Sequence, residues 1–79
     1  MASELSERLQ AAIERLPDQC RLIFTMNRFE ELKYQEIADR LGLSVKTVEN
    51  QIGKALRILR VELAEYLPLF ILLGIHAYD

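Results

Sequence analysis

The stretch YQEIADRLGLSVKTVEN, residues 34–50, decides the fold. Its first part, Tyr34–Leu41, places apolar side chains on one helical face, and Gly42 follows where a helix can end on a left-handed residue. Ser44 stands at the N-cap position of a second apolar-periodic segment. Two helices joined by so short a turn are typical of a helix-turn-helix, which we predict at about residues 34–56.

Around this motif, apolar residues at spacings of three and four predict further helices and no β-strand. We expect a first helix at about residues 3–16 and a second at about 17–28, with a proline in the first turn of the second. The helix after Ser44 is expected to continue to about residue 67, where Pro68 ends or kinks it. The sequence therefore predicts an all-α domain of four helices over residues 1–67, followed by an apolar tail over residues 68–79.

The same periodicity predicts which side chains form the core. Its expected members are Leu5, Leu9, Ala12, Ile13, Leu16, Leu22, Ile23, Met26, Ile37, Ala38, Leu41, Val45, Val48, Ile52, either Ala55 or Leu56, Leu59 and Leu63. Cys20 is expected to be a buried or half-buried small residue beside Ile23.

Composition excludes several kinds of site. The 79 residues include one cysteine and one histidine, too few for an internal disulfide or a cysteine-rich zinc site. We find no catalytic triad order, paired catalytic carboxylates or phosphate-binding glycine loop, so we expect neither an enzyme nor a cofactor. The start of the chain lacks the apolar region of a signal peptide, and the uncharged run at residues 67–75 is shorter than the roughly 20 residues that span a membrane. These features favour a cytoplasmic protein associated with the nucleoid.

Charge is distributed unevenly along the chain. The whole sequence has 10 basic and 12 acidic residues and a net charge of −2, which by itself argues against a nucleic-acid partner. Residues 40–60, however, carry five basic residues and one acidic residue, whereas residues 1–39 and residues 61–79 are both net acidic. A basic segment on the second helix of a helix-turn-helix is the electrostatic pattern expected for phosphate contact. We therefore predict that this helix binds double-stranded DNA.

The outward positions of that helix carry side chains that can contact DNA. Lys46, Glu49 and Asn50 have the chemistry to reach base edges, and Thr47 offers a hydroxyl or a methyl group. Gly53 is unexpected on the outer face, because glycine destabilises a helix by about 1 kcal/mol relative to alanine. Close approach to DNA or a tight contact between helices would explain it.

The sequence from Leu16 to Arg60 resembles region 4 of bacterial sigma factors, most of all those of the extracytoplasmic-function group. The resemblance rests on the Leu-Pro opening, on the connection Phe29–Leu32, and on EIADRLGLSVKTVE followed by KALRILR, and it covers about residues 3–67. It implies a winged-helix-like bundle of three to four helices that binds the −35 promoter element and docks on the β flap of RNA polymerase core.

The resemblance also implies roles for individual residues. By position, a base-reading turn and its flanking phosphate contacts would consist of Arg40, Ser44, Lys46, Thr47, Glu49, Asn50, Lys54 and Arg57. One departure is Lys33, which stands where the family usually has a serine or threonine cap and predicts a less sharp helix start. The other departure is length, because the chain leaves no room for a region that binds the −10 element, which favours an excised domain over a stand-alone protein.

Two other functions remain open at this stage. The segment GLSVKTVEN also resembles the helix-turn-helix output domain of response regulators, which usually dimerise and bind palindromes. The third possibility is an interaction module that binds an anti-sigma factor or a second copy of itself through the apolar segment at residues 67–75. That segment could equally complete the core, and His76 beyond it is expected to lie in a frayed terminus.

Overall fold

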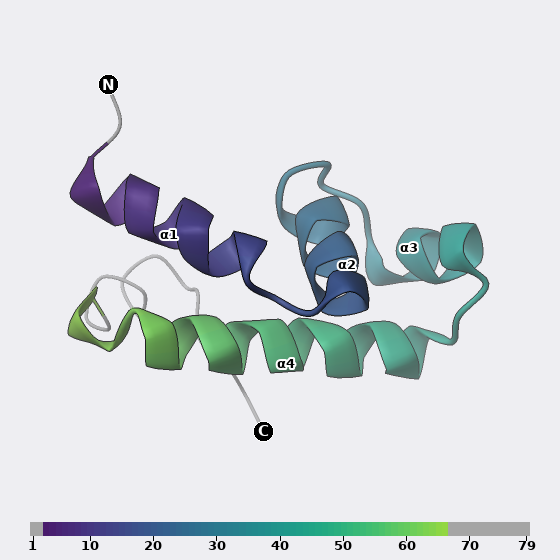
Figure 1. Cartoon of the computed structure of the whole chain (residues 1–79). Coiled ribbons are helices and arrows are strands. Elements are labelled where there is room, and N and C mark those ends of the chain that lie inside the picture. Colours follow the sequence, from purple (N-terminus) through teal and green to yellow (C-terminus); the bar gives the residue numbers. More distant parts are fainter. Residues whose placement is uncertain (1–2, 67–79) are drawn as a thin grey trace.

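The computed structural model describes residues 3–66, which are almost entirely helical (Figure 1). The elements are α1 (Glu4–Glu14), α2 (Asp18–Arg28), α3 (Tyr34–Leu41), α4 (Val45–Glu62) and the short 3-10 helix η1 (Ala64–Tyr66). This confirms the predicted all-α fold with four helices. Residues 3–66 contain no β-strand, so the winged-helix likeness extends to the helices alone.

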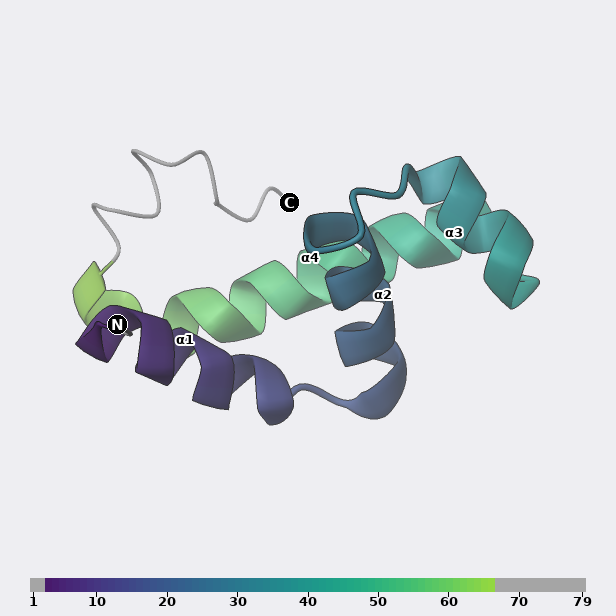
Figure 2. The same cartoon turned by 90° about the horizontal axis from the view of Figure 1, so that it is seen from above.

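Helix α4 is the long element on which the others assemble. Both views show α1 and α3 at opposite ends of α4, with α2 between them (Figures 1 and 2). Each of the three shorter helices packs against α4, and α2 also packs against α3. One face of α4 is therefore buried along its length, whereas within residues 3–66 the side chains on its opposite face are exposed.

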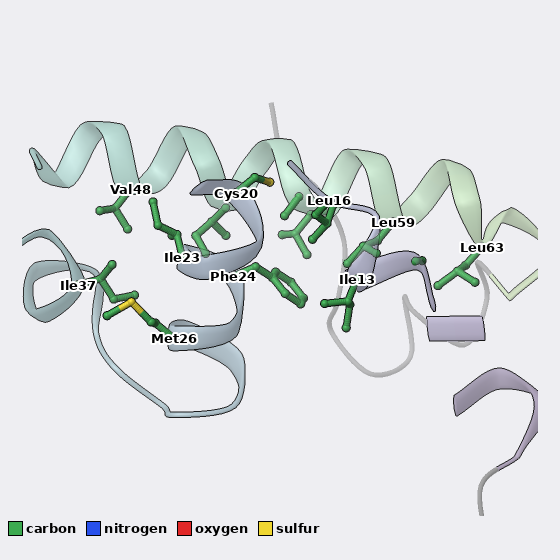
Figure 3. Packing of buried hydrophobic residues seen from close by; sticks show 14 of the residues in the cluster. Ile13, Leu16, Cys20, Ile23, Phe24, Met26, Ile37, Val48, Leu59 and Leu63 are labelled. Atoms are coloured by element: carbon green, nitrogen blue, oxygen red, sulfur yellow. The ribbon is translucent and has the colours of Figure 1, made fainter. Parts of the chain in front are cut away.

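A single apolar core fills the space beside α4. Ile23, Ile37 and Val48 gather where α2, α3 and α4 meet, and Ile13 and Leu59 lie between α1 and α4 (Figure 3). Full burial of these branched side chains removes apolar surface from water, which is the main stabilising term available to a chain whose single cysteine cannot form an internal disulfide. The predicted core is confirmed for most of its members.

Three sequence-based expectations about packing need correction. Leu22 was expected in the core, but it is 47% exposed because it lies on the side of α2 that faces away from α4. Ala55 and Leu56 were treated as alternatives, yet both are buried because the apolar stripe of α4 is wide enough for two neighbours. Leu5, at the start of α1, is only half-buried.

The helix ends agree with the predicted signals except at two positions. Ser3 caps α1 by accepting a hydrogen bond from the Ser6 amide at 3.0 Å. Pro17 is the N-cap of α2, one position before the expected first turn. Helix α4 ends at Glu62 and not near residue 67, because Leu63 leaves the helical conformation and η1 follows.

Cys20 is a buried core residue, as predicted. Its side chain is 1% exposed, and its Sγ donates to the carbonyl oxygen of Gln51 on α4 at 3.5 Å. Burial raises the pKa of the Cys20 thiol, and the positive charges of Lys54 and Arg57 offset part of that rise. A thiol held in its neutral form and shielded from solvent packs as a small apolar group and is a poor nucleophile.

The expectations for the apolar tail, including His76 and self-association through residues 67–75, lie outside the described residues. Among residues 3–66, no helix is both long enough and apolar enough to cross a membrane.

Candidate nucleic-acid interface

The turn between α3 and α4 has the geometry that the motif requires. Gly42 adopts a left-handed conformation with φ of 68°, which a glycine reaches without steric cost. The Leu43 amide then donates to the Ala38 carbonyl at 2.9 Å, and Leu43 packs against the core. The turn therefore fixes the direction in which α4 leaves α3.

The start of α3 is held by an acidic side chain in place of a hydroxyl cap. The Lys33 side chain makes no capping hydrogen bond, because an ammonium group has no acceptor. The carboxylate of Glu36 instead accepts from the Lys33 backbone amide at 2.8 Å. A capping box normally has two hydrogen bonds, and Glu36 supplies one of them. This bond partly offsets the helix stabilisation that the missing serine or threonine cap would provide.

The first turn of α4 is closed by two hydroxyl groups. Ser44 Oγ accepts from the Thr47 amide at 3.0 Å and donates to Thr47 Oγ1 at 2.9 Å. These bonds confirm Ser44 as the N-cap. They also mean that the Ser44 hydroxyl is already hydrogen-bonded within the protein. The Thr47 hydroxyl hydrogen and methyl group remain for contact with a partner, and the Thr47 side chain is half-buried.

The other predicted DNA-binding side chains are exposed. Lys46, Glu49, Asn50, Lys54 and Arg57 all lie on the side of α4 opposite the core. Their spacing of three and four residues aligns them over three turns of one helix. Arg40 is also exposed but belongs to α3, so it lies beside this face and is not part of it.

A groove runs along one flank of the outer face of α4. It has a volume of about 390 Å³ and is open to solvent along one side. Its lining comes from α4 and from the first residue of α3, and consists of Tyr34, Lys46, Glu49, Asn50, Ile52, Gly53, Leu56 and Arg57. The groove thus brings four of the eight predicted site residues together and leaves the other four outside, namely Arg40, Ser44, Thr47 and Lys54.

Tyr34 is the groove residue that sequence reasoning missed. It opens α3 and is half-buried against the core, so its pattern is that of an ordinary packing residue. Nothing in its spacing indicates that the start of α3 lies beside Gly53 and Arg57, because that proximity depends on how the two helices cross. The only available signal was an aromatic residue at the entrance of a helix-turn-helix.

Three of the five basic residues before residue 40 are bound to acidic neighbours, whereas Arg28 and Lys33 form no ion pair within residues 3–66. Arg8 pairs with Glu65 of η1, and Arg15 pairs with Glu62 at the end of α4 at 3.0 Å. Arg21 pairs with an aspartate in the first turn of α2 at 3.1 Å. These exposed pairs each contribute little to stability. The first two join α1 to the C-terminal end of α4 and to η1, whereas the third lies within α2.

The basic residues of the predicted DNA-binding segment are not bound to acidic neighbours in this way. Within residues 3–66, none of the following five forms an ion pair: Arg40, Lys46, Lys54, Arg57 and Arg60. All five are exposed. Unneutralised cations on one exposed surface attract a polyanion and release its condensed counterions on binding.

The geometry therefore supports contact with double-stranded nucleic acid. An exposed α-helix fits the major groove of B-form DNA, where amide, carboxylate and ammonium groups can read base edges. Among the residues that the structure describes, no group of histidine, cysteine and acidic side chains is arranged to hold a metal ion.

Comparisons with known proteins agree with this interpretation. The family described as "Sigma-70, region 4" matches residues 6–59. A curated relative, the RNA polymerase sigma factor SigV of Bacillus subtilis (strain 168), is 33% identical over 57 residues, which cover 72% of this chain. The chain spans about a third of that relative, since the alignment covers 34% of its length. No solved structure matches the chain significantly.

Proposed function

Because the chain belongs to the sigma-70 region 4 family, we propose that it recognises the −35 promoter element within an RNA polymerase sigma factor. The observation that carries this proposal is the outer face of α4, where unpaired basic side chains flank Glu49 and Asn50. The family match favours this function over the response-regulator alternative.

In this proposal α4 lies in the major groove. Lys46, Glu49 and Asn50 contact base edges, because they occupy the first two turns of the helix and carry groups that match the donors and acceptors of the groove. Lys54 and Arg57 follow one turn later and contact backbone phosphates, as does Arg40 from α3. Thr47 supplies its methyl group to a base, and Ser44 orients the turn.

Two substitutions separate base reading from phosphate binding. Lys54→Ala should weaken binding to all sequences about equally and reduce the slope of log affinity against log salt by about 1. Asn50→Ala should change which sequence is preferred, with about 1–3 kcal/mol lost at the base that Asn50 contacts. The measurement is fluorescence anisotropy over a salt series, with duplexes selected by the chain from a randomised pool.

A matched duplex of scrambled sequence serves as the control for sequence preference. The assignment of α4 would be wrong if neither substitution altered binding to either duplex. A selected sequence with inverted repeats, bound by two copies of the chain, would instead support the response-regulator type of function.

We also propose that α2 provides the docking surface for RNA polymerase core, in the region of the β flap. Leu22 and Phe29 are 47% and 64% exposed and lie seven residues apart, on the same face of the helix. Phe29 is held edge-on against Phe24, with ring centroids 6.5 Å apart. An exposed apolar pair of this kind suits a protein partner better than DNA.

Leu22→Glu should reduce binding of the chain to RNA polymerase core at least about tenfold, since it places a charge in an apolar contact. DNA binding by the same variant should change little. The control is Val61→Glu, which charges an exposed apolar position on α4 and should leave core binding intact. Equal core binding by both variants would exclude α2 as the docking surface, and retention of an anti-sigma factor in place of core would reassign the surface to that partner.

A further inference from the structure

Gly53 has no conformational or packing reason to be a glycine. It lies inside α4, where glycine lowers helix stability relative to alanine. Among the glycines of the described chain, only Gly42 has a positive φ. A β-carbon added to Gly53 would meet no atom of another helix within 4 Å, so the tight helix–helix contact that the sequence allowed is absent from the described part of the chain.

Among the described residues, the side chain that lies close to Gly53 is that of Arg57. A β-carbon at Gly53 would lie 3.3 Å from Arg57 Nη1, closer than is usual for such a contact. Arg57 is one turn further along α4, and its side chain folds back across the space that a larger residue would occupy. A side chain at position 53 would therefore require the guanidinium to move from its present position.

That location is at the groove beside α3. Gly53 and Arg57 line it together with Tyr34 and Asn50, and Arg57 forms no ion pair within residues 3–66. A guanidinium presents parallel N–H donors that match two phosphate oxygens. The groove also has room for a phosphate with its nearest waters.

We infer that Gly53 is a positioning residue for DNA binding: it holds Arg57 over the groove, where the guanidinium binds one backbone phosphate of the DNA strand. This inference rests on the proposed function. It assigns the phosphate contact of Arg57 to the groove beside α3. Gly53 itself acts through Arg57, whose guanidinium lies in the space that a β-carbon at position 53 would crowd.

The test is a double-mutant cycle between Gly53→Ala and Arg57→Ala, read by DNA binding and by thermal unfolding. Gly53→Ala should raise Tm by about 4–8 °C, because alanine favours the helix. The same variant should bind DNA about 5–10-fold more weakly, with the salt slope reduced by about 1, because Arg57 is displaced from its phosphate. In the Arg57→Ala background, Gly53→Ala should change DNA affinity by less than about twofold.

Val61→Ala is the matched control, because it also raises helix propensity at an exposed position of α4 but lies outside the groove. It should leave affinity unchanged. The inference is overturned if Gly53→Ala binds as tightly as the unmodified chain, or if it weakens binding equally with and without Arg57. Absence of salt-dependent DNA binding by the unmodified chain would overturn the proposed function as well, so the two failures are distinguishable.

Discussion

Reversing two charges on the outer face of α4, with Lys46→Glu and Lys54→Glu together, should reduce DNA affinity at least about 100-fold near 0.1 M salt. Each lysine lost removes about one released counterion from the binding equilibrium, and each glutamate added repels the phosphates. Both lysines are exposed and form no ion pair within residues 3–66, so the folded state loses no ion pair there. The measurement is anisotropy at several salt concentrations, with circular dichroism to confirm helix content.

The control places the same change in net charge on α2, with Arg21→Glu and Arg28→Glu. Arg21 gives up one exposed ion pair, which is worth at most about 1 kcal/mol. If binding depended only on the total charge of the chain, both double variants would lose affinity equally. We expect the α2 variant to retain most of its affinity, because α4 is the helix that contacts DNA.

The helix-turn-helix could be predicted from sequence because each of its parts is a local signal. Gly42 marks a left-handed helix end, Ser44 marks an N-cap, and the structure places both as expected. The position of the basic segment on α4 follows from the same register, since residues three or four apart share a face. Local signals of this kind do not depend on how distant helices pack.

Features that depend on packing could not be predicted in the same way. Leu22 is as apolar as its neighbours, and only the position of α4 shows that it faces solvent. The end of α4 at Glu62 lacks a glycine or proline signal, because Pro68 comes six residues later. Glu31 adopts a φ of 57° between α2 and α3, a conformation that glycine or asparagine usually marks.

The groove is the clearest case of a feature that arises from tertiary structure. Gly53 was noticed for its cost to the helix, but its neighbour across the groove, Tyr34, comes from the start of another helix. The sequence left open whether Gly53 faces DNA or another helix. The contact with Arg57, and the absence of any other neighbour within 4 Å among the described residues, removes the second explanation.

Ile23→Ala should destabilise the domain by about 2–5 kcal/mol and lower Tm by at least about 10 °C. Ile23 is fully buried at the junction of α2, α3 and α4, where its removal leaves a cavity that the surrounding helices can fill only in part (Figure 3). A domain of this size has a total stability of about 4–12 kcal/mol, so the variant could lose half of it. Chemical denaturation measures the loss directly.

The neighbouring residue provides the matched control. Leu22 precedes Ile23 on α2, and both were expected in the core, but Leu22 is 47% exposed. Leu22→Ala should therefore change the free energy of unfolding by no more than about 0.5–1 kcal/mol. Similar losses from the two substitutions would mean that α2 is rotated from its described orientation. In that case the face of α2 assigned to polymerase docking would also be wrong, because Leu22 and Phe29 share it.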